Sequence, residues 1–316
     1  GLAAAQEFEG ISRAKKVQIG VAEDLEPAVP EADAGEALPT SDIDVEIPVT
    51  SVQRPDAVGV VIGITEYAHP DVPAVDYARR DALLMRDYLI RAMGFREENI
   101  IVAVDQEATK AAFNRIFEGQ LENYIKPGVS DVFVYYAGHG APDLGGEDGG
   151  EPGAGGASAY FVPNDADPNY AAQTGYSLDE FYRRLNGLDA QSVTVVVDAC
   201  FSGGSAAGML IQQASPIFIS VEHPAANLAS GVVLTSSSGD QISSWYQEVG
   251  HGLFTYFFLK GIRGEADGDS DGKVTSAEVF GYILENVPYL ARRLFNREQT
   301  PQLMGGVVDQ VLVEYE

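Results

Sequence analysis

Apolar runs alternate with amphipathic stretches along the chain from about residue 57 to its C-terminal end. The run AVGVVIGI at 57–64 carries no polar side chain, which is typical of a strand buried on both faces of a sheet. Shorter apolar runs predict five further strands at 99–104, 131–137, 193–197, 231–235 and 307–313. Stretches with apolar residues three and four positions apart predict helices over 75–93, 110–124, 178–185, 253–261 and 276–293.

Strands that alternate with helices indicate an α/β fold with a mostly parallel central sheet and helices on both faces. We place this domain at 54–316. Residues 20–50 carry nine acidic side chains, four prolines and no Lys or Arg, so the N-terminal extension 1–53 is predicted to contain an extended, self-repelling linker. Residues 143–158 hold seven glycines and four acidic residues, and we predict a mobile loop there.

The chain is strongly acidic, with 20 Lys and Arg against 47 Asp and Glu and a formal charge of −27. Such a surface repels phosphate backbones, so we expect no nucleic-acid partner, and it favours metal ions or basic peptides. The absence of an apolar run of about 18 residues predicts no membrane span. The single cysteine, Cys200, excludes an intramolecular disulfide and a multi-cysteine zinc site. The sequence does not indicate an oligomeric state.

Two predicted strands end in reactive side chains. The strand at 131–137 continues into Gly138-His139-Gly140, and Cys200 follows the strand at 193–197. The carboxyl ends of parallel strands share one edge of a sheet, so the two side chains can meet there if the strands are neighbours. An imidazole stabilises a thiolate nucleophile and then protonates the leaving amine. The N–H groups of Gly140 and Cys200 are candidate donors to an oxyanion.

The alternative is that Cys200 is a small buried hydrophobe and His139 a hydrogen-bonded turn residue. The other histidines, His69, His223 and His251, are interpreted as surface or structural residues.

The segments YYAGHG at 135–140 and DACFSG at 198–203 resemble the His and Cys motifs of the caspase-like cysteine peptidases, closest to bacterial metacaspase-like members. The order, His before Cys, is the same. The resemblance covers roughly residues 57–316. It implies a caspase-like three-layer sandwich and a cysteine endopeptidase with a Cys200–His139 dyad.

The same resemblance indicates a substrate preference. A carboxylate two residues before the nucleophile, Asp198, attracts Arg or Lys and repels acidic side chains, as the pocket aspartate of trypsin does. The resemblance implies that Asp198 and Asp81 line a pocket for basic side chains, with Ser236 and Asp240 at its border. The partners would then be peptides or proteins cut after Arg or Lys. Alternatively, Asp198 only binds loop amides and Asp81 caps a turn.

Residues 267–278 match the 12-residue calcium loop of EF-hands. Gly272 stands at the sharp turn, and the expected ligands are Asp267, Asp269, Asp271, the carbonyl of Lys273, Thr275 and Glu278. We predict calcium as the cofactor, with no organic cofactor. The alternative is an acidic turn without a metal.

Arg13, Lys15 and Lys16 form a basic cluster in the extension, where an enzyme specific for basic residues could cut itself. The alternatives are that the extension covers the active site as an inhibitory flap or that it is an inert tether. Two other functions stay open: a catalytically idle caspase-fold scaffold that binds calcium and partners, or a related peptidase of the clostripain or legumain type. The acidity, the calcium loop and the small residues at 1–6 favour a secreted or periplasmic location.

Overall fold

The computed structural model describes residues 38–142, 159–201, 204–205, 208–209, 228–238 and 241–315. The predicted loop at 143–158, the basic cluster at 13–16 and Asp240 lie outside these ranges. The described residues belong to one compact unit that begins at Leu38. Within them, no helix is both long and apolar enough to cross a membrane.

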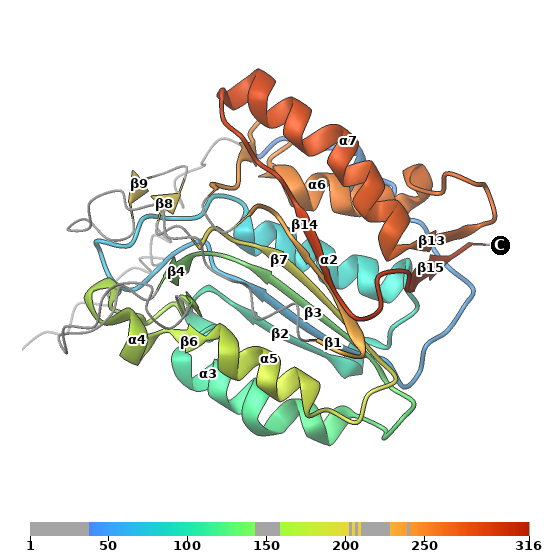
Figure 1. The fold of residues 1–316 in the computed structure, drawn as a ribbon, viewed down its shortest axis with the longest axis horizontal. Coiled ribbons are helices and arrows are strands. Elements are labelled where there is room, and N and C mark those ends of the chain that lie inside the picture. Colours follow the sequence, from blue (N-terminus) through green and yellow to red (C-terminus); the bar gives the residue numbers. More distant parts are fainter. Residues whose placement is uncertain are drawn as a thin grey trace, which may run out of the picture. The chain divides into compact units, whose positions relative to one another are not determined.

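A six-stranded sheet forms the centre of this unit (Figure 1). Its strands, in spatial order, are β14 (Gln302–Gly305), β10 (Gly231–Thr235), β7 (Ser192–Asp198), β3 (Asp131–Ala137), β1 (Val58–Gly63) and β2 (Ile100–Val104). Neighbouring strands are parallel except at β14, which runs antiparallel to β10. The strands β3 and β7 are neighbours, and Ala137 is paired with Asp198 at their carboxyl ends. The condition under which His139 and Cys200 can meet is therefore fulfilled.

Helices cover both faces of the sheet, which gives the three layers that the sequence predicts (Figure 1). On one side lie α2 (Ala78–Arg91), α6 (Leu253–Lys260) and α7 (Ser276–Phe295), and on the other α3 (Lys110–Arg115) and α5 (Leu178–Asn186). Each side has its own apolar core, because alternate residues of a strand point to opposite faces: Val61 packs in one core and Val60 in the other. The predicted α/β fold is confirmed.

Short elements complete the described fold. They are α1 (Asp42–Val45), β4 (Gly140–Pro142), β5 (Ala159–Phe161), α4 (Ala171–Thr174), β6 (Tyr176–Ser177), β8 (Gly204–Ser205), β9 (Gly208–Met209), β11 (Trp245–Tyr246), β12 (His251–Gly252), β13 (Lys273–Thr275) and β15 (Val311–Glu314). The helix predicted over 110–124 continues beyond α3 only as a π turn and a 3-10 turn, which end at Tyr124.

The last predicted strand, 307–313, is confirmed in part as β15 (Val311–Glu314), but this strand does not belong to the central sheet. The sixth strand of the sheet is β14, and β15 pairs instead with β13 in a separate ribbon. All four residues of β14 are only half-buried, as expected of an edge strand, so its sequence lacks the apolar run that identified the other strands. β14 ends at Gly305, whose φ of +112° a glycine adopts without strain.

Residues 38–53 pack onto the domain, so the predicted linker and the boundary at residue 54 do not hold for this segment. Ile43 of α1 is fully buried, and the Tyr88 hydroxyl donates to its carbonyl oxygen at 3.0 Å. The acidic side chains of the segment bind cations rather than repelling one another: Asp42 lies 2.9 Å from Lys260 Nζ and 3.1 Å from Arg263. These partners stand more than 200 positions away in the sequence, where a local pattern cannot reveal them.

Candidate active site

His139 follows β3 and is held by hydrogen bonds of its backbone and of its ring. Its N–H donates to the Tyr67 hydroxyl at 2.8 Å, and its carbonyl accepts from the Tyr136 hydroxyl at 2.6 Å. The ring nitrogen Nε2 lies 2.7 Å from the carbonyl oxygen of Pro73. A carbonyl oxygen only accepts, so Nε2 carries the proton and Nδ1 is left as the proton acceptor.

Cys200 lies beyond the end of β7 and lines one pocket together with His139. Both residues are buried, at 6% and 2% exposure, and the backbone N–H of Ser243 donates to Sγ at 2.7 Å. Burial raises the pKa of the Cys200 thiol to about 11, against the lowering effect of the Ser243 N–H. Burial also lowers the pKa of His139 to about 4, although the Pro73 carbonyl acts to raise it. At neutral pH the free pair is therefore an uncharged thiol beside an uncharged imidazole.

Gly140 brings the two loops together but does not present its amide to the pocket. Its N–H donates to the carbonyl oxygen of Cys200 at 3.2 Å, in continuation of the β3–β7 pairing. A Cβ at this position would lie 2.3 Å from the Phe201 ring, so only glycine fits. Contrary to the sequence-based expectation, the Gly140 N–H is therefore not free to bind an oxyanion. It becomes free only when its hydrogen bond to the Cys200 carbonyl opens.

Acidic side chains form one wall of the pocket. Asp81, Asp198 and the exposed Asp76 line it, and no Lys or Arg is among the described residues that do so. Asp81 and Asp198 lie on the same side of Gly252: a Cβ there would be 3.1 Å from Asp81 Oδ2 and 2.6 Å from Asp198 Oδ2. Burial raises the pKa of Asp198 to about 6; the nearby Asp81 charge adds to this, while the bond from the Thr255 hydroxyl, at 2.7 Å, opposes it. The structure thus brings both predicted specificity residues to the Cys–His pair.

Ser236 takes a different place from the one predicted. It is fully buried, and its hydroxyl bonds to that of Ser243 and to the Ala199 carbonyl, the latter at 3.4 Å. Ser236 therefore supports the loops that carry Cys200 and Ser243 from behind, and the side chains that line the pocket do not include it. The fourth predicted pocket residue, Asp240, lies outside the described residues.

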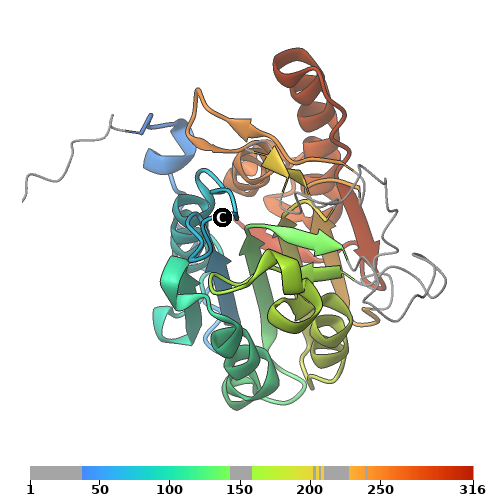
Figure 2. The same ribbon diagram turned by 90° about the vertical axis from the view of Figure 1, so that its left-hand side faces the viewer.

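His251, which the sequence analysis interpreted as a surface or structural residue, lies next to one of the predicted pocket residues. It is fully buried in β12, with Nδ1 2.5 Å from Asp81 Oδ1 and Nε2 3.2 Å from each carboxylate oxygen of Asp44. Figure 2 faces the edge of the sheet where β3 and β7 end, and it shows α1, which carries Asp44, beside the β11–β12 hairpin. One feature of the sequence distinguishes His251: it lies between two glycines, Gly250 and Gly252, as His139 lies between Gly138 and Gly140.

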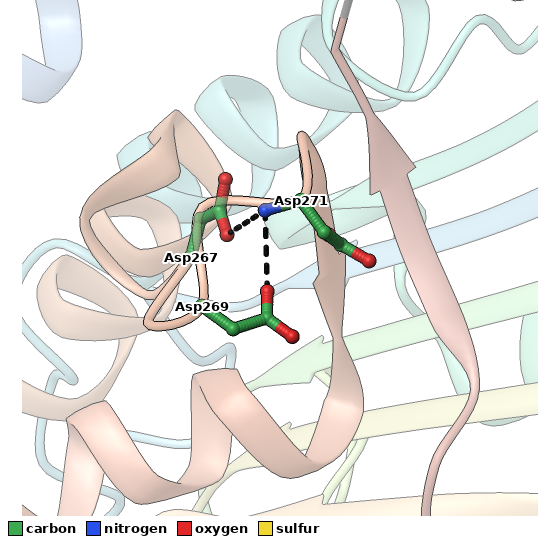
Figure 3. A group of neighbouring side chains, drawn as sticks. All are labelled: Asp267, Asp269 and Asp271. Atoms are coloured by element: carbon green, nitrogen blue, oxygen red, sulfur yellow. Dashed lines mark hydrogen bonds between the residues drawn. The ribbon is translucent and has the colours of Figure 1, made fainter.

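The predicted calcium loop brings three of its acidic side chains together. Asp267, Asp269 and Asp271 each offer a carboxylate oxygen, and these oxygens lie within 4.8 Å of one another (Figure 3). The backbone N–H of Asp271 donates to both other carboxylates at 3.2 Å, and Gly272 turns the chain with a φ of +81°. Several carboxylate oxygens converging on one point are the donor set that Ca²⁺ prefers, so the residues present fit this ion.

Two of the remaining predicted ligands, Thr275 and Glu278, are hydrogen-bonded to each other in this structure. Thr275 begins α7, and the Glu278 carboxylate accepts from the N–H of Thr275 at 2.9 Å and from its hydroxyl at 3.0 Å. This reciprocal capping box satisfies the first turn of the helix. Lys273, whose carbonyl is the expected ligand, pairs with Glu314 in the β13–β15 ribbon.

Comparisons with known proteins agree with the fold. A family model described as the caspase domain matches residues 57–309. A crystal structure of a protein from Geobacter sulfurreducens superposes with a TM-score of 0.56 at 16% identity, over 83% of this chain and 100% of the other. That of caspase-1 from Spodoptera frugiperda gives 0.54 at 11% identity, over 86% and 94%. At these identities the likeness shows the fold alone. No match was found among curated protein sequences.

Proposed function

This chain belongs to the caspase-domain family of peptidases, and from that membership we propose that it is a cysteine endopeptidase that cleaves after Arg or Lys with Cys200 and His139 as its catalytic pair. One observation carries the proposal: the only thiol of the chain shares a pocket with an imidazole whose free nitrogen is the proton acceptor, and two buried carboxylates line the same pocket.

The resting pair is uncharged, so catalysis begins with a proton transfer. Nδ1 of His139 takes the proton from Sγ of Cys200, and the thiolate attacks the scissile carbonyl carbon. The Pro73 carbonyl, 2.7 Å from Nε2, holds the ring and stabilises the imidazolium. The protonated Nδ1 then donates to the leaving amine as the carbon–nitrogen bond breaks. His139 next takes a proton from water, which hydrolyses the thioester and frees Sγ.

The oxyanion of the tetrahedral intermediate needs donors close to Sγ. The Cys200 N–H is one, since it belongs to the nucleophile itself. The Gly140 N–H joins it only after its bond to the Cys200 carbonyl opens. Substrate binding therefore includes a local separation of the loops that follow β3 and β7.

The preference for a basic residue rests on charge. An Arg or Lys side chain that enters the pocket meets the buried carboxylates of Asp81 and Asp198, whereas an acidic side chain meets two like charges. Ion pairs are stronger in a buried pocket than at an exposed surface, because little water screens them.

The test compares fluorogenic peptides that end in Arg, Lys or Asp, with wild-type protein and Cys200→Ala. We expect cleavage of the Arg and Lys peptides only, and none by the variant. An Arg-based thiol-reactive inhibitor should label Cys200 stoichiometrically. Faster cleavage of the Asp peptide would refute the basic preference. Failure of both cleavage and labelling would refute the peptidase and leave a catalytically idle scaffold.

We extend the proposal to two further properties. Calcium binds the loop 267–278, a proposal supported by the convergence of Asp267, Asp269 and Asp271. The protein cuts itself at the basic cluster of Arg13, Lys15 and Lys16, since these are residues of the preferred type. Intact mass spectrometry of aged wild-type and Cys200→Ala protein tests the second property, and identical masses would contradict it.

A further inference from the structure

The imidazole of His251 is enclosed between two carboxylates from different parts of the chain. Asp81 of α2 faces Nδ1 at 2.5 Å, and Asp44 of α1 faces Nε2 at 3.2 Å. Burial would lower the pKa of His251, but these two carboxylates outweigh burial and raise it. Both ring nitrogens face acceptors, which is the arrangement that a doubly protonated ring satisfies.

Asp81 and Asp198 need such a positive charge nearby. Both are buried, and their Oδ2 atoms both lie close to the site that a Cβ of Gly252 would occupy. Two like charges this close in a buried pocket cannot both persist without compensation. Asp81 receives a second bond from the Gly252 N–H, at 2.8 Å, which fixes its carboxylate toward Asp198.

We propose that His251 is a positioning residue of the substrate pocket. Through its contacts with Asp81 and Asp44, it orients the Asp81 carboxylate. Its positive charge also allows Asp81 and Asp198 to stay ionised together and to bind one cationic substrate side chain. This inference rests on the proposed preference for Arg and Lys and assigns it a further determinant. His251 does not line the pocket, so it acts on the substrate only through Asp81.

The proposal also gives a role to residues that precede the caspase-domain match at 57–309. Asp44 is held in place by Arg80, at 2.9 Å, and by the N–H of Ser41, at 2.7 Å. Arg80 in turn donates to the Pro39 carbonyl at 2.7 Å. Positive and negative groups thus alternate from Arg80 through Asp44 and His251 to Asp81. The segment 38–47 in this way supports the substrate pocket from outside, without lining it.

The experiment uses the full chain and two peptides that end in Arg or in citrulline, which has the shape of Arg without its charge. The ratio of the two kcat/KM values measures charge recognition alone. Both peptides meet the same enzyme sample, so any loss of folded protein in a variant cancels in the ratio. The variants are His251→Asn, which keeps a donor near the position of Nδ1 but cannot be charged, and Asp44→Asn.

We expect the Arg-to-citrulline ratio to fall about tenfold in His251→Asn, the effect of losing one charged hydrogen bond, and by a smaller factor in Asp44→Asn. The kcat/KM for the citrulline peptide should fall by a smaller factor than that for the Arg peptide, since citrulline carries no charge for Asp81 and Asp198 to bind. The matched controls are His69→Asn and Asp87→Asn, whose side chains are partly exposed and lie outside the pocket lining, and they should keep the wild-type ratio.

The outcomes separate the two proposals. If wild-type protein does not distinguish Arg from citrulline, the preference for basic residues is wrong and the role of His251 is wrong with it. If wild-type protein prefers Arg and both variants keep the full ratio, the role of His251 is wrong while the proposed function stands. If the citrulline peptide loses as much activity as the Arg peptide, His251 is structural and does not set specificity.

Discussion

The carbonyl oxygen of Pro73 lies 2.7 Å from Nε2 of His139 and determines which ring nitrogen can act on the thiol. In many catalytic triads a carboxylate takes this position and stabilises the imidazolium. A neutral carbonyl orients the ring but gives less electrostatic support to a positive charge. The free enzyme accordingly keeps its imidazole and its thiol uncharged, with a pKa of about 4 for His139 and about 11 for Cys200.

This resting state predicts slow alkylation of Cys200. The thiol pKa is raised by burial from 9.0 to about 11, so at pH 7 the thiolate fraction is lower by roughly 100-fold than that of an ordinary cysteine. We expect iodoacetamide to react slowly with the folded protein at pH 7 and faster as the pH rises, and the urea-unfolded chain to react at the ordinary rate. Equal rates for the folded and unfolded protein at pH 7 would contradict the uncharged resting pair.

His139→Ala removes the acceptor of the thiol proton. We expect kcat/KM for an Arg peptide to fall by about 10² to 10⁴-fold, the usual effect of general acid–base catalysis. The control is His69→Ala, which should retain wild-type activity. Its partly exposed ring accepts a hydrogen bond from the Asp71 N–H at 3.2 Å and lies 4.0 Å from the carboxylates of Asp71 and Asp167. An active His139→Ala enzyme would show that another group takes the proton.

The preference for a basic residue should depend on pH through Asp198. Burial and the Asp81 charge raise its pKa from 3.8 to about 6, so its carboxylate is ionised above this pH and neutral below it. The Arg-to-citrulline ratio should therefore be highest above pH 7 and fall as the pH drops through about 6. A ratio that stays constant down to pH 5 would show that Asp198 does not contact the substrate charge.

Calcium should stabilise the protein through the loop at 267–278. A ligand at 100 times its Kd adds about 2.7 kcal/mol to the free energy of unfolding, which raises Tm by several degrees. We expect this shift, and binding heat in calorimetry, with wild-type protein and with Asp56→Asn, a surface control. Asp267→Asn should lose both, because it removes a converging carboxylate. No heat with millimolar calcium would refute the site.

The segment before residue 54 should contribute to stability. Ile43→Ala removes a fully buried side chain and should lower the free energy of unfolding by about 2–5 kcal/mol. Val45 of the same short helix is 63% exposed, and Val45→Ala should change it by less than about 0.5 kcal/mol. Urea unfolding measures both variants, and equal effects would show that α1 is not packed in solution.

The fold and the catalytic pair follow from local sequence. The strands β1, β3 and β7 are buried on both faces, so their apolar runs are continuous, and His139 and Cys200 stand directly after two of them. The parallel order of such strands places both side chains at one edge of the sheet. The acidic side of the pocket could also be predicted, because the charge of Asp198 and the family resemblance of Asp198 and Asp81 both indicate a site for basic side chains.

Other features depend on contacts between distant residues. In the sequence alone, the acidic stretch around Asp42 resembles a linker. In the fold, Lys260 and Arg263 neutralise the charge of Asp42. The Gly140 N–H is engaged because β3 pairs with β7, and a sequence motif does not reveal which strands are neighbours. The role of His251 likewise becomes visible only when Asp44 and Asp81 are seen on its two sides.

The position of α1 has a practical consequence for how this enzyme is produced. A recombinant fragment trimmed to the family match at 57–309 would lack Ile43 and Asp44 together. Such a fragment would lose a core contact and expose one side of His251, so under the proposed role of His251 it would distinguish Arg from citrulline less well than the full chain. Domain boundaries drawn from family resemblance alone would here discard part of the compact unit that begins at Leu38.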